Sequence, residues 1–321
     1  MSAPADPHAP PPAWSRHGSG DPRADRRYLF ALAALERGDG AAAAEVARQA
    51  LELSPHWPPA WLLLGEAEQA AGRIEAAAEA YREAAARDPE DILGARLRLG
   101  RLAGRAGGAP AAMSRSYVAA LFDDYAPRFE RHLTDVLGYR GPDEIVRVLA
   151  ALPDGRDRRW RCALDLGCGT GLMARALEGS AERIEGCDLS AAMVALAGAT
   201  GRYARVEQAD AVSWLRTRPP AAADLVTAAD VAVYVGDLGD LFRAAALALA
   251  PGGLFALTLQ TGPREGYALG DDLRFRHAPS YAARAGFAAG LPVVAEEPFV
   301  VRLDRGAPLP GAIVVCRREG P

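Results

Sequence analysis

An aspartate followed by three alternating glycines has the residue types and the spacing of a ligand-binding turn. Segment 165–171 reads DLGCGTG, and residues without a Cβ allow a tight bend on which a ligand can lie against the backbone at a helix start. The dinucleotide fingerprint needs a further glycine at position 172, which is Leu. Asp165 would repel a pyrophosphate and attract an ammonium group. The sequence therefore favours a cationic ligand without phosphate.

Two more carboxylates follow the next predicted strands. Asp188 ends the segment EGCD, where a carboxylate can accept hydrogen bonds from both ribose hydroxyls. Asp210 lies in QADA and can accept from an adenine amino group. Each aspartate alone is better explained as a solvated loop residue. The ordered set, together with the glycine turn, predicts a site for a positively charged adenosine compound.

The elements that position these residues alternate between strand-like and helix-like segments. Strands are expected at 161–166, 183–188, 203–207, 223–229, 253–260, 292–301 and 311–317. Helices are expected between the first five, whereas only RGAPLPG joins the last two, which should form an antiparallel hairpin. The pattern predicts a Rossmann-like α/β sheet of seven strands with the last one antiparallel. Ligands bind such sheets at the carboxyl ends of strands, where the strand order reverses.

A helical repeat precedes this region. Four residues recur after 34 positions, the period of tetratricopeptide repeats: Gly38, Ala43, Ala50 and Pro55 match Gly72, Ala77, Ala84 and Pro89. In the second copy Trp61 and Tyr81 are expected to pack between the two helices, and Ala47 stands in the place of Tyr81 in the first. Residues 91–104 should form a closing helix. A generic Ala-rich helical hairpin is the alternative.

The motifs DLGCGTG, GCDLS and QADA resemble those of class I S-adenosylmethionine-dependent methyltransferases. The wider sequence, over roughly residues 26–318, is similar to predicted methyltransferases that carry N-terminal tetratricopeptide repeats. Gln260 departs from this group, in which a glutamate often follows the fifth strand. We expect a disordered tail over 1–24, a helical repeat domain over 25–105, a linker over 106–114 and an S-adenosylmethionine-binding methyltransferase domain over 115–321.

The resemblance implies S-adenosylmethionine as the cofactor and a specific set of residues around it. Asp165 and the glycine turn would hold the methionine end, Asp188 the ribose and Asp210 with Ala211 the adenine. A segment around Tyr125 would cover the cofactor, although Phe122, Tyr125 and Phe129 also fit the apolar face of an amphipathic helix. The expected cofactor-binding residues are Asp165, Gly167, Cys168, Gly169, Gly171, Asp188, Leu189, Asp210, Ala211 and Tyr125.

Candidates for the methyl acceptor follow the fourth and fifth strands. The candidate catalytic residues are Asp230, His277 and Tyr281, and the candidate substrate-binding residues are Tyr234, Arg274 and Arg276. His277 can serve as a general base or simply begin a helix, and the arginines can hold a carboxylate or phosphate. Because methyl transfer from a sulfonium needs mainly alignment, which supplies ~7–11 kcal/mol of the barrier, the sequence leaves the acceptor atom and the use of a base open.

The leading interpretation is methyl transfer to an O, N or S acceptor on a peptide, protein or carrier-bound substrate that the repeats recruit. The alternatives are a methyltransferase for a free small metabolite, with repeats that oligomerise the chain, and a non-catalytic scaffold. The absence of an (N/D)PPY motif argues against adenine methylation in DNA.

The net charge, the cysteine spacing and the length of the apolar runs argue against several other classes of protein. A net charge of -4 argues against a broad nucleic-acid footprint. The four cysteines, without CxxC spacing, read as buried thiols rather than metal ligands. The sequence shows no signal-peptide pattern and no apolar run of membrane-spanning length. We expect a cytoplasmic protein with no bound metal and no contact with membranes.

Overall fold

The computed structural model describes residues 18–104, 110–126, 129, 138–155, 158–304 and 307–320. The chain divides into two compact units, Met1–Asp124 and Tyr125–Pro321, which are described in turn. Part of the expected tail and linker, 1–17 and 106–109, lies outside the described residues. Residues 22–24, also assigned to the tail, belong to the first helix.

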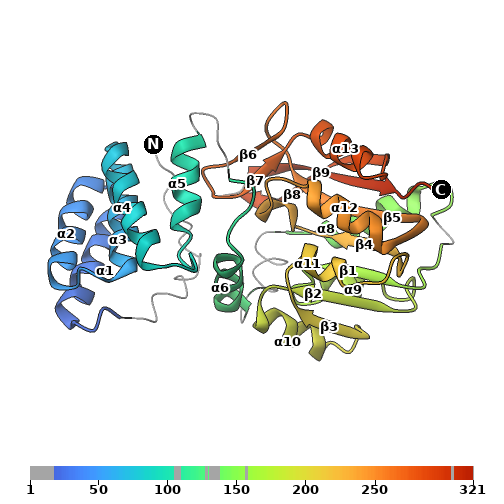
Figure 1. Cartoon of the computed structure of the whole chain (residues 1–321), viewed down its shortest axis with the longest axis horizontal. Coiled ribbons are helices and arrows are strands. Elements are labelled where there is room, and N and C mark those ends of the chain that lie inside the picture. Colours follow the sequence, from blue (N-terminus) through green and yellow to red (C-terminus); the bar gives the residue numbers. More distant parts are fainter. Residues whose placement is uncertain are drawn as a thin grey trace. The chain divides into compact units, whose positions relative to one another are not determined.

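The first unit is helical. Its helices are α1 (Pro22–Glu36), α2 (Gly40–Leu53), α3 (Pro58–Ala70), α4 (Ile74–Arg87), α5 (Ala95–Gly104) and α6 (Arg115–Tyr125), which reaches the boundary of the units. Consecutive helices from α1 to α5 pack on one another (Figure 1). The first two helices begin at capping residues: the side chains of Asp21 and Asp39 accept hydrogen bonds from the first turns of α1 and α2.

The second repeat copy packs as the sequence predicted at its central contact. Tyr81 is 1% exposed, and a Cβ at Gly65 would overlap its ring. Trp61 is partly buried against the same helices; its indole N–H donates to the Pro55 carbonyl oxygen at 2.8 Å, and the Arg87 guanidinium lies over its ring. The small residues therefore allow α3 and α4 to approach closely around Tyr81.

The second unit is built on one sheet with helices on both faces. Its strands are β1 (Ala163–Leu166), β2 (Ile184–Asp188), β3 (Arg205–Gln208), β4 (Ala223–Ala228), β5 (Leu249–Gln260), β8 (Val293–Asp304) and β9 (Ala307–Arg317). The helices are α8 (Gly141–Ala151), α9 (Leu172–Ala176), α10 (Ala191–Ala199), α11 (Ala211–Arg216), α12 (Gly239–Ala248) and α13 (Pro279–Ala288), with a short 3₁₀ helix η4 (Ala232–Tyr234).

The strand order is β3-β2-β1-β4-β5-β9-β8. The first five strands are parallel, and β9 runs antiparallel to both β5 and β8. The predicted seven-stranded sheet with an antiparallel last strand is confirmed. The chain moves outward from β1 to β3 and then returns to β4 on the other side of β1, so the order reverses beside the glycine turn.

A second, two-stranded sheet of β6 (Tyr267–Leu269) and β7 (Phe275–His277) was not predicted. Three-residue strands are too short to show the alternation by which strands are recognised in a sequence. This small sheet carries Arg276 and His277, two of the candidate acceptor-side residues, so they stand on a hairpin rather than in an irregular loop.

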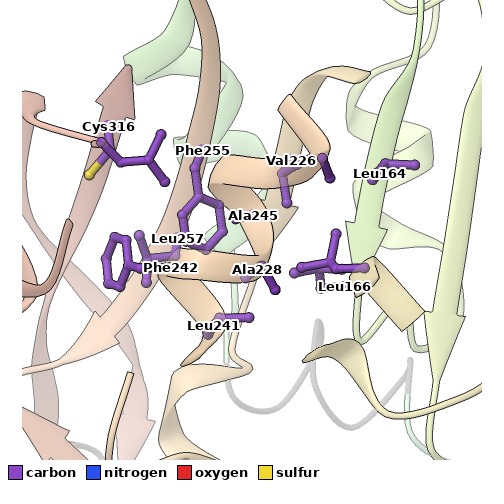
Figure 2. Close-up of a cluster of buried hydrophobic side chains, with 14 of the residues drawn as sticks. Leu164, Leu166, Val226, Ala228, Leu241, Phe242, Ala245, Phe255, Leu257 and Cys316 are labelled. Atoms are coloured by element: carbon purple, nitrogen blue, oxygen red, sulfur yellow. The ribbon is translucent and has the colours of Figure 1, made fainter. Parts of the chain in front are cut away.

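Alternate residues of the main sheet face two separate cores. Leu164, Val226 and Phe255 pack against α11, α12 and α13, and Figure 2 shows them with Leu241, Phe242 and Ala245 of α12. On the other face, Ala163 and Leu225 pack against α8 and α9. Since both faces are covered, the central strands read as apolar runs in the sequence, which is why they were recognisable.

None of the helices in the described ranges is both long and apolar enough to cross a membrane.

Candidate cofactor and acceptor site

The glycine turn connects β1 to α9 and has a left-handed backbone at each glycine. The φ angles are +62° at Gly167, +52° at Gly169 and +93° at Gly171, a region that side chains with a Cβ adopt at a cost. A Cβ at Gly167 would lie 2.7 Å from Cγ2 of Val231, so the loop after β4 rests directly on the turn. The turn thus requires glycine for both its conformation and its close approach to β4.

Asp188 joins the turn to the end of the neighbouring strand β2. Its Oδ2 accepts a hydrogen bond from the Gly169 N–H at 2.9 Å, and its Oδ1 accepts from the Ser190 N–H at 2.9 Å. The Cys168 N–H donates to the Cys187 carbonyl oxygen at 3.0 Å, so both middle residues of the turn are bonded to β2. The Asp188 carboxylate therefore fixes the glycine turn to the end of β2, where the sequence predicts the ribose of the cofactor.

Asp165 lies beneath the turn in a buried network of hydroxyl groups. It is 1% exposed and accepts hydrogen bonds from Tyr203 at 2.6 Å and from Thr227 at 3.0 Å. Burial raises the pKa of Asp165 to about 7, while the two hydroxyl donors and the charge of Asp188 act less strongly. The structure therefore gives Asp165 two internal partners, and its contact with a ligand ammonium group stays a prediction.

The predicted adenine-side residues lie at the end of β3. Asp210 is half-buried and caps α11, because its Oδ1 accepts from the Ser213 N–H at 2.9 Å. Leu189 and Ala211 are also half-buried, and the Leu189 carbonyl oxygen accepts from the Gln208 side chain at 3.1 Å. All three stand at the carboxyl ends of β2 and β3, the same edge of the sheet as the glycine turn.

Aromatic residues near the start of the second unit reach the same turn. A Cβ at Gly169 would lie 3.8 Å from the Phe129 ring, and the Phe129 ring meets the ring of Tyr125 edge to face at 5.2 Å between centroids. Residues 127–128 and 130–137 are outside the described residues. Tyr125 thus connects to the turn through Phe129, and its contact with the cofactor remains a prediction.

Asp230, Tyr234 and Arg274 form one cluster on the acceptor side. Asp230 has a φ of +60° and its N–H donates to Oγ1 of Thr258 at 2.8 Å, which holds the loop after β4 against β5. Arg274 donates to the Tyr234 hydroxyl at 2.7 Å and lies 4.0 Å from Asp230. Val231, which follows Asp230 in the sequence, contacts the glycine turn. The cluster therefore adjoins the predicted cofactor position.

His277 and Tyr281 form a separate group. Their rings stack at 6.1 Å between centroids. The Tyr281 hydroxyl donates to Asp237 at 2.9 Å and accepts from the Leu238 N–H at 3.0 Å. His277 is fully buried, and burial lowers its pKa. Its Nε2 lies 3.0 Å from the Gly236 carbonyl oxygen, which requires the proton on Nε2 and leaves Nδ1 as the basic nitrogen. Both residues hold the loop that follows η4.

Arg276 is on the small hairpin, where it lies 3.4 Å from Asp272. The Gln260 side chain also donates to Asp272 at 3.4 Å. Arg276 is thus part of an internal charge pair rather than of the cluster around Asp230.

Sequence reasoning missed several residues of this site: Tyr139, Tyr203, Thr227, Thr258 and Arg302. Thr227 and Thr258 are hydroxyl residues within otherwise apolar strands, which is a detectable signal. Arg302 is a charge near the end of the apolar run FVVRL. Tyr139 and Tyr203 lie outside strands, and nothing in their local sequence indicates the contacts that they make.

Comparisons with known proteins agree with this architecture. A family model described as a methyltransferase domain matches residues 164–257, and one described as a tetratricopeptide repeat matches residues 34–99. The ubiquinone biosynthesis O-methyltransferase of Burkholderia lata is 32% identical over 98 residues, and that of Burkholderia orbicola is 30% identical over 94. In both cases the match covers 28% of this chain and 40% of the relative. The chain therefore aligns with about two fifths of the length of these curated relatives.

Among solved structures, a chain from the complex that contains the Haloferax volcanii Trm112 methyltransferase activator is similar, with a TM-score of 0.52 and 19% identity. The alignment covers 64% of this chain and 98% of that chain. At this identity the likeness concerns the fold. Taken with the two family models and the strand order, it agrees with the prediction made from the glycine turn and the helical repeat: residues 164–257 match a methyltransferase domain, residues 34–99 match tetratricopeptide repeats, and the sheet has the strand order of the Rossmann-like methyltransferase fold.

Proposed function

We propose that this protein transfers a methyl group from S-adenosylmethionine to an oxygen, nitrogen or sulfur atom of a small-molecule acceptor. The observation that carries the proposal is the pair of hydrogen bonds around Asp188, which fixes the glycine turn beside a carboxylate at the carboxyl ends of β1 and β2. The ubiquinone biosynthesis O-methyltransferases, whose name indicates a small-molecule acceptor, support the substrate class.

The residues present fit the cofactor. The left-handed turn provides a surface without side chains, and Asp188 and Asp210 offer acceptors for ribose hydroxyls and an adenine amino group. When bound, S-adenosylmethionine supplies an activated methyl group. The work of the chain is then to hold the acceptor in line and to exclude water, which is worth ~7–11 kcal/mol.

Of the three candidate bases, Asp230 has the most suitable surroundings. Its Oδ1 is buried and accepts no hydrogen bond from the described residues, and its loop rests on the glycine turn through Val231. The Tyr281 hydroxyl already has two partners, and burial raises its pKa to about 12. His277 is fully buried against the Gly236 carbonyl. We therefore assign Asp230 to accept a proton or a hydrogen bond from the acceptor.

Calorimetry with S-adenosylhomocysteine tests the cofactor assignment. The full chain should bind it, and Asp188→Ala should bind at least tenfold more weakly, because the variant loses two turn-fixing hydrogen bonds and the ribose acceptor. Asp154→Ala is the matched control, since that exposed carboxylate pairs with Arg317 away from the glycine turn. Equal binding by both variants, or tighter binding of NADH than of S-adenosylhomocysteine, would contradict the proposal.

A second candidate function is recruitment of a peptide, protein or carrier-bound acceptor through the repeats, which the tetratricopeptide match favours. The first unit carries a hollow of about 390 Å³ lined by Arg23, Arg26, Arg27, Phe30, Val46 and Gln49. If it recruits the substrate, Phe30→Ser should raise KM and leave S-adenosylhomocysteine affinity unchanged. Phe287→Ser is the control, since Phe287 is a similarly exposed aromatic of the second unit. An unchanged KM in Phe30→Ser favours the small-molecule function.

A further inference from the structure

Two arginines and one aspartate share a largely buried position beside the glycine turn. The side chains of Arg302, Asp230 and Arg274 are 11%, 19% and 27% exposed. Arg276 and Asp272 pair nearby and cancel in charge. The cluster therefore has an excess of one positive charge, and it is removed from most of the solvent that would otherwise screen it.

The arginines are close to Asp230 without being hydrogen-bonded to it. The N–O distances to Oδ2 of Asp230 are 3.9 Å from Arg302 and 4.0 Å from Arg274, whereas a charge-assisted hydrogen bond measures about 2.7–2.9 Å. Arg274 also donates to the Tyr234 hydroxyl. Arg302 makes no hydrogen bond to any residue that the structure describes. A guanidinium has five donors, and burial without acceptors is costly.

Two more buried polar atoms in this place lack partners among the described residues: the Tyr139 hydroxyl and Oδ1 of Asp230. Burial raises the pKa of Tyr139, and the charges of Asp230 and Asp165 raise it further. The Arg302 donors and the unbonded Oδ1 of Asp230 thus lie together, since Arg302 is 3.9 Å from the other oxygen of the same carboxylate. Buried polar groups are nearly always satisfied, so their convergence indicates a ligand that carries both an acceptor and a donor.

A local irregularity in the pairing of β8 with β9 places Arg302 in this region. Because β9 is antiparallel to both β5 and β8, the end of β8 lies at the same edge as the carboxyl ends of the parallel strands. Between Val300 and Leu303, β8 has one residue more than β9 in its register. Such a bulge redirects a side chain and is frequent beside active sites. The bulged strand packs closely on Gly311, where a Cβ would overlap Val301.

We propose that Arg302 and Arg274 bind an anionic oxygen group of the methyl acceptor, a carboxylate or a phosphate, while Asp230 accepts a hydrogen bond from its methyl-accepting group. The guanidinium fork matches both anions. Burial and the positive charge of Arg274 lower the pKa of Arg302, and an anion between the two would relieve that repulsion. The proposal names the substrate class of the proposed methyltransferase function and rests on it.

Binding of simple probes to the full chain tests this assignment. The probes are meta-hydroxybenzoate, phenyl phosphate and the neutral meta-hydroxybenzamide, titrated into protein saturated with S-adenosylhomocysteine and followed by ligand-observed NMR. At least one anionic probe should bind roughly tenfold or more tightly than the amide. Comparison of the two anions distinguishes a carboxylate site from a phosphate site.

Substitutions test whether the tighter binding of the anionic probes depends on Arg302. Arg302→Gln should remove the preference for the anionic probe, and Arg302→Lys should restore part of it because the charge remains but the fork does not. Arg264→Gln, which removes an exposed arginine outside the cluster, should leave the preference unchanged. Unchanged S-adenosylhomocysteine affinity in each variant shows that the second unit is folded.

The two proposals fail in different ways. If the protein binds S-adenosylhomocysteine but no probe shows the anionic preference, or if Arg302→Gln retains it, the substrate-class assignment is overturned and the cofactor assignment stands. If S-adenosylhomocysteine does not bind, the cofactor assignment falls, and the same probes titrated alone decide whether the arginines form an anion site.

Discussion

Replacing Asp165 with Asn should change how the stability of the second unit depends on pH. In the folded protein, burial raises the pKa of this carboxyl from 3.8 to about 7. A difference of about three pH units corresponds to ~4 kcal/mol between the protonated and ionised forms. Because the folded pKa is the higher one, the folded state binds the additional proton, and this contribution to stability is present below pH 4 and is lost as the pH rises to about 7.

The variant keeps the shape of the side chain and cannot titrate, so it isolates this contribution. Relative to Asp165→Asn, the free energy of unfolding of the wild type should fall by up to ~4 kcal/mol between pH 4 and pH 7.5. Urea unfolding can be followed by fluorescence with Trp14, Trp57 and Trp61 replaced by Phe, which leaves Trp160 and Trp214 of the second unit as reporters. A difference between wild type and variant that is constant across this pH range would refute the reasoning.

Three further substitutions test the close contacts. Gly167→Ala should destabilise the second unit by ~2 kcal/mol and weaken S-adenosylhomocysteine binding in calorimetry, because φ is +62° and the new Cβ meets Val231. Gly65→Ala gains ~1 kcal/mol of helix propensity but overpacks Tyr81 at a cost of ~1–3 kcal/mol, so thermal unfolding of the repeat unit should occur at lower temperature. Tyr203→Phe removes a hydrogen bond that lowers the pKa of Asp165, so the pH transition described above should shift upward.

Gly198→Ala is the matched control for both glycine substitutions. Gly198 lies in α10, and nothing lies within 4 Å of an added Cβ. This substitution should stabilise the second unit slightly through helix propensity. If Gly65→Ala is equally stabilising in its own unit, the ring of Tyr81 moves aside at little cost and the packing argument is wrong. A transition in Tyr203→Phe that stays at the wild-type pH would show that the Tyr203 hydroxyl does not influence Asp165.

The sequence was most informative where a residue type has one common structural use. The glycines of the turn and the apolar strands predicted the central sheet. The recurrence of Gly38 as Gly72 indicated the helical repeat, and in the structure both glycines have a positive φ at a helix end. The spacing of Asp165, Asp188 and Asp210 placed them at neighbouring strand ends, as the structure does. These features are local, so they can be read without knowing the tertiary contacts.

The acceptor side was less predictable because its residues come together only in three dimensions. Arg302 reaches the site through a register irregularity of β8, which no local pattern reveals. Tyr203 and Thr227 meet Asp165 from different elements. Conversely, Arg276 was selected for its charge, and its neighbour on the hairpin is Asp272. A sequence gives the charges of such residues but not their partners.

The double attachment of Asp188 bears on the kinetics of ligand capture. Since its two oxygens tie Gly169 and Ser190 together, the loops after β1 and β2 form one rigid cradle whose ordering entropy was lost during folding. A nucleoside that arrives there does not have to immobilise the backbone, so preorganisation should favour affinity. Loosening that link should then appear chiefly as faster dissociation, with the encounter rate little altered.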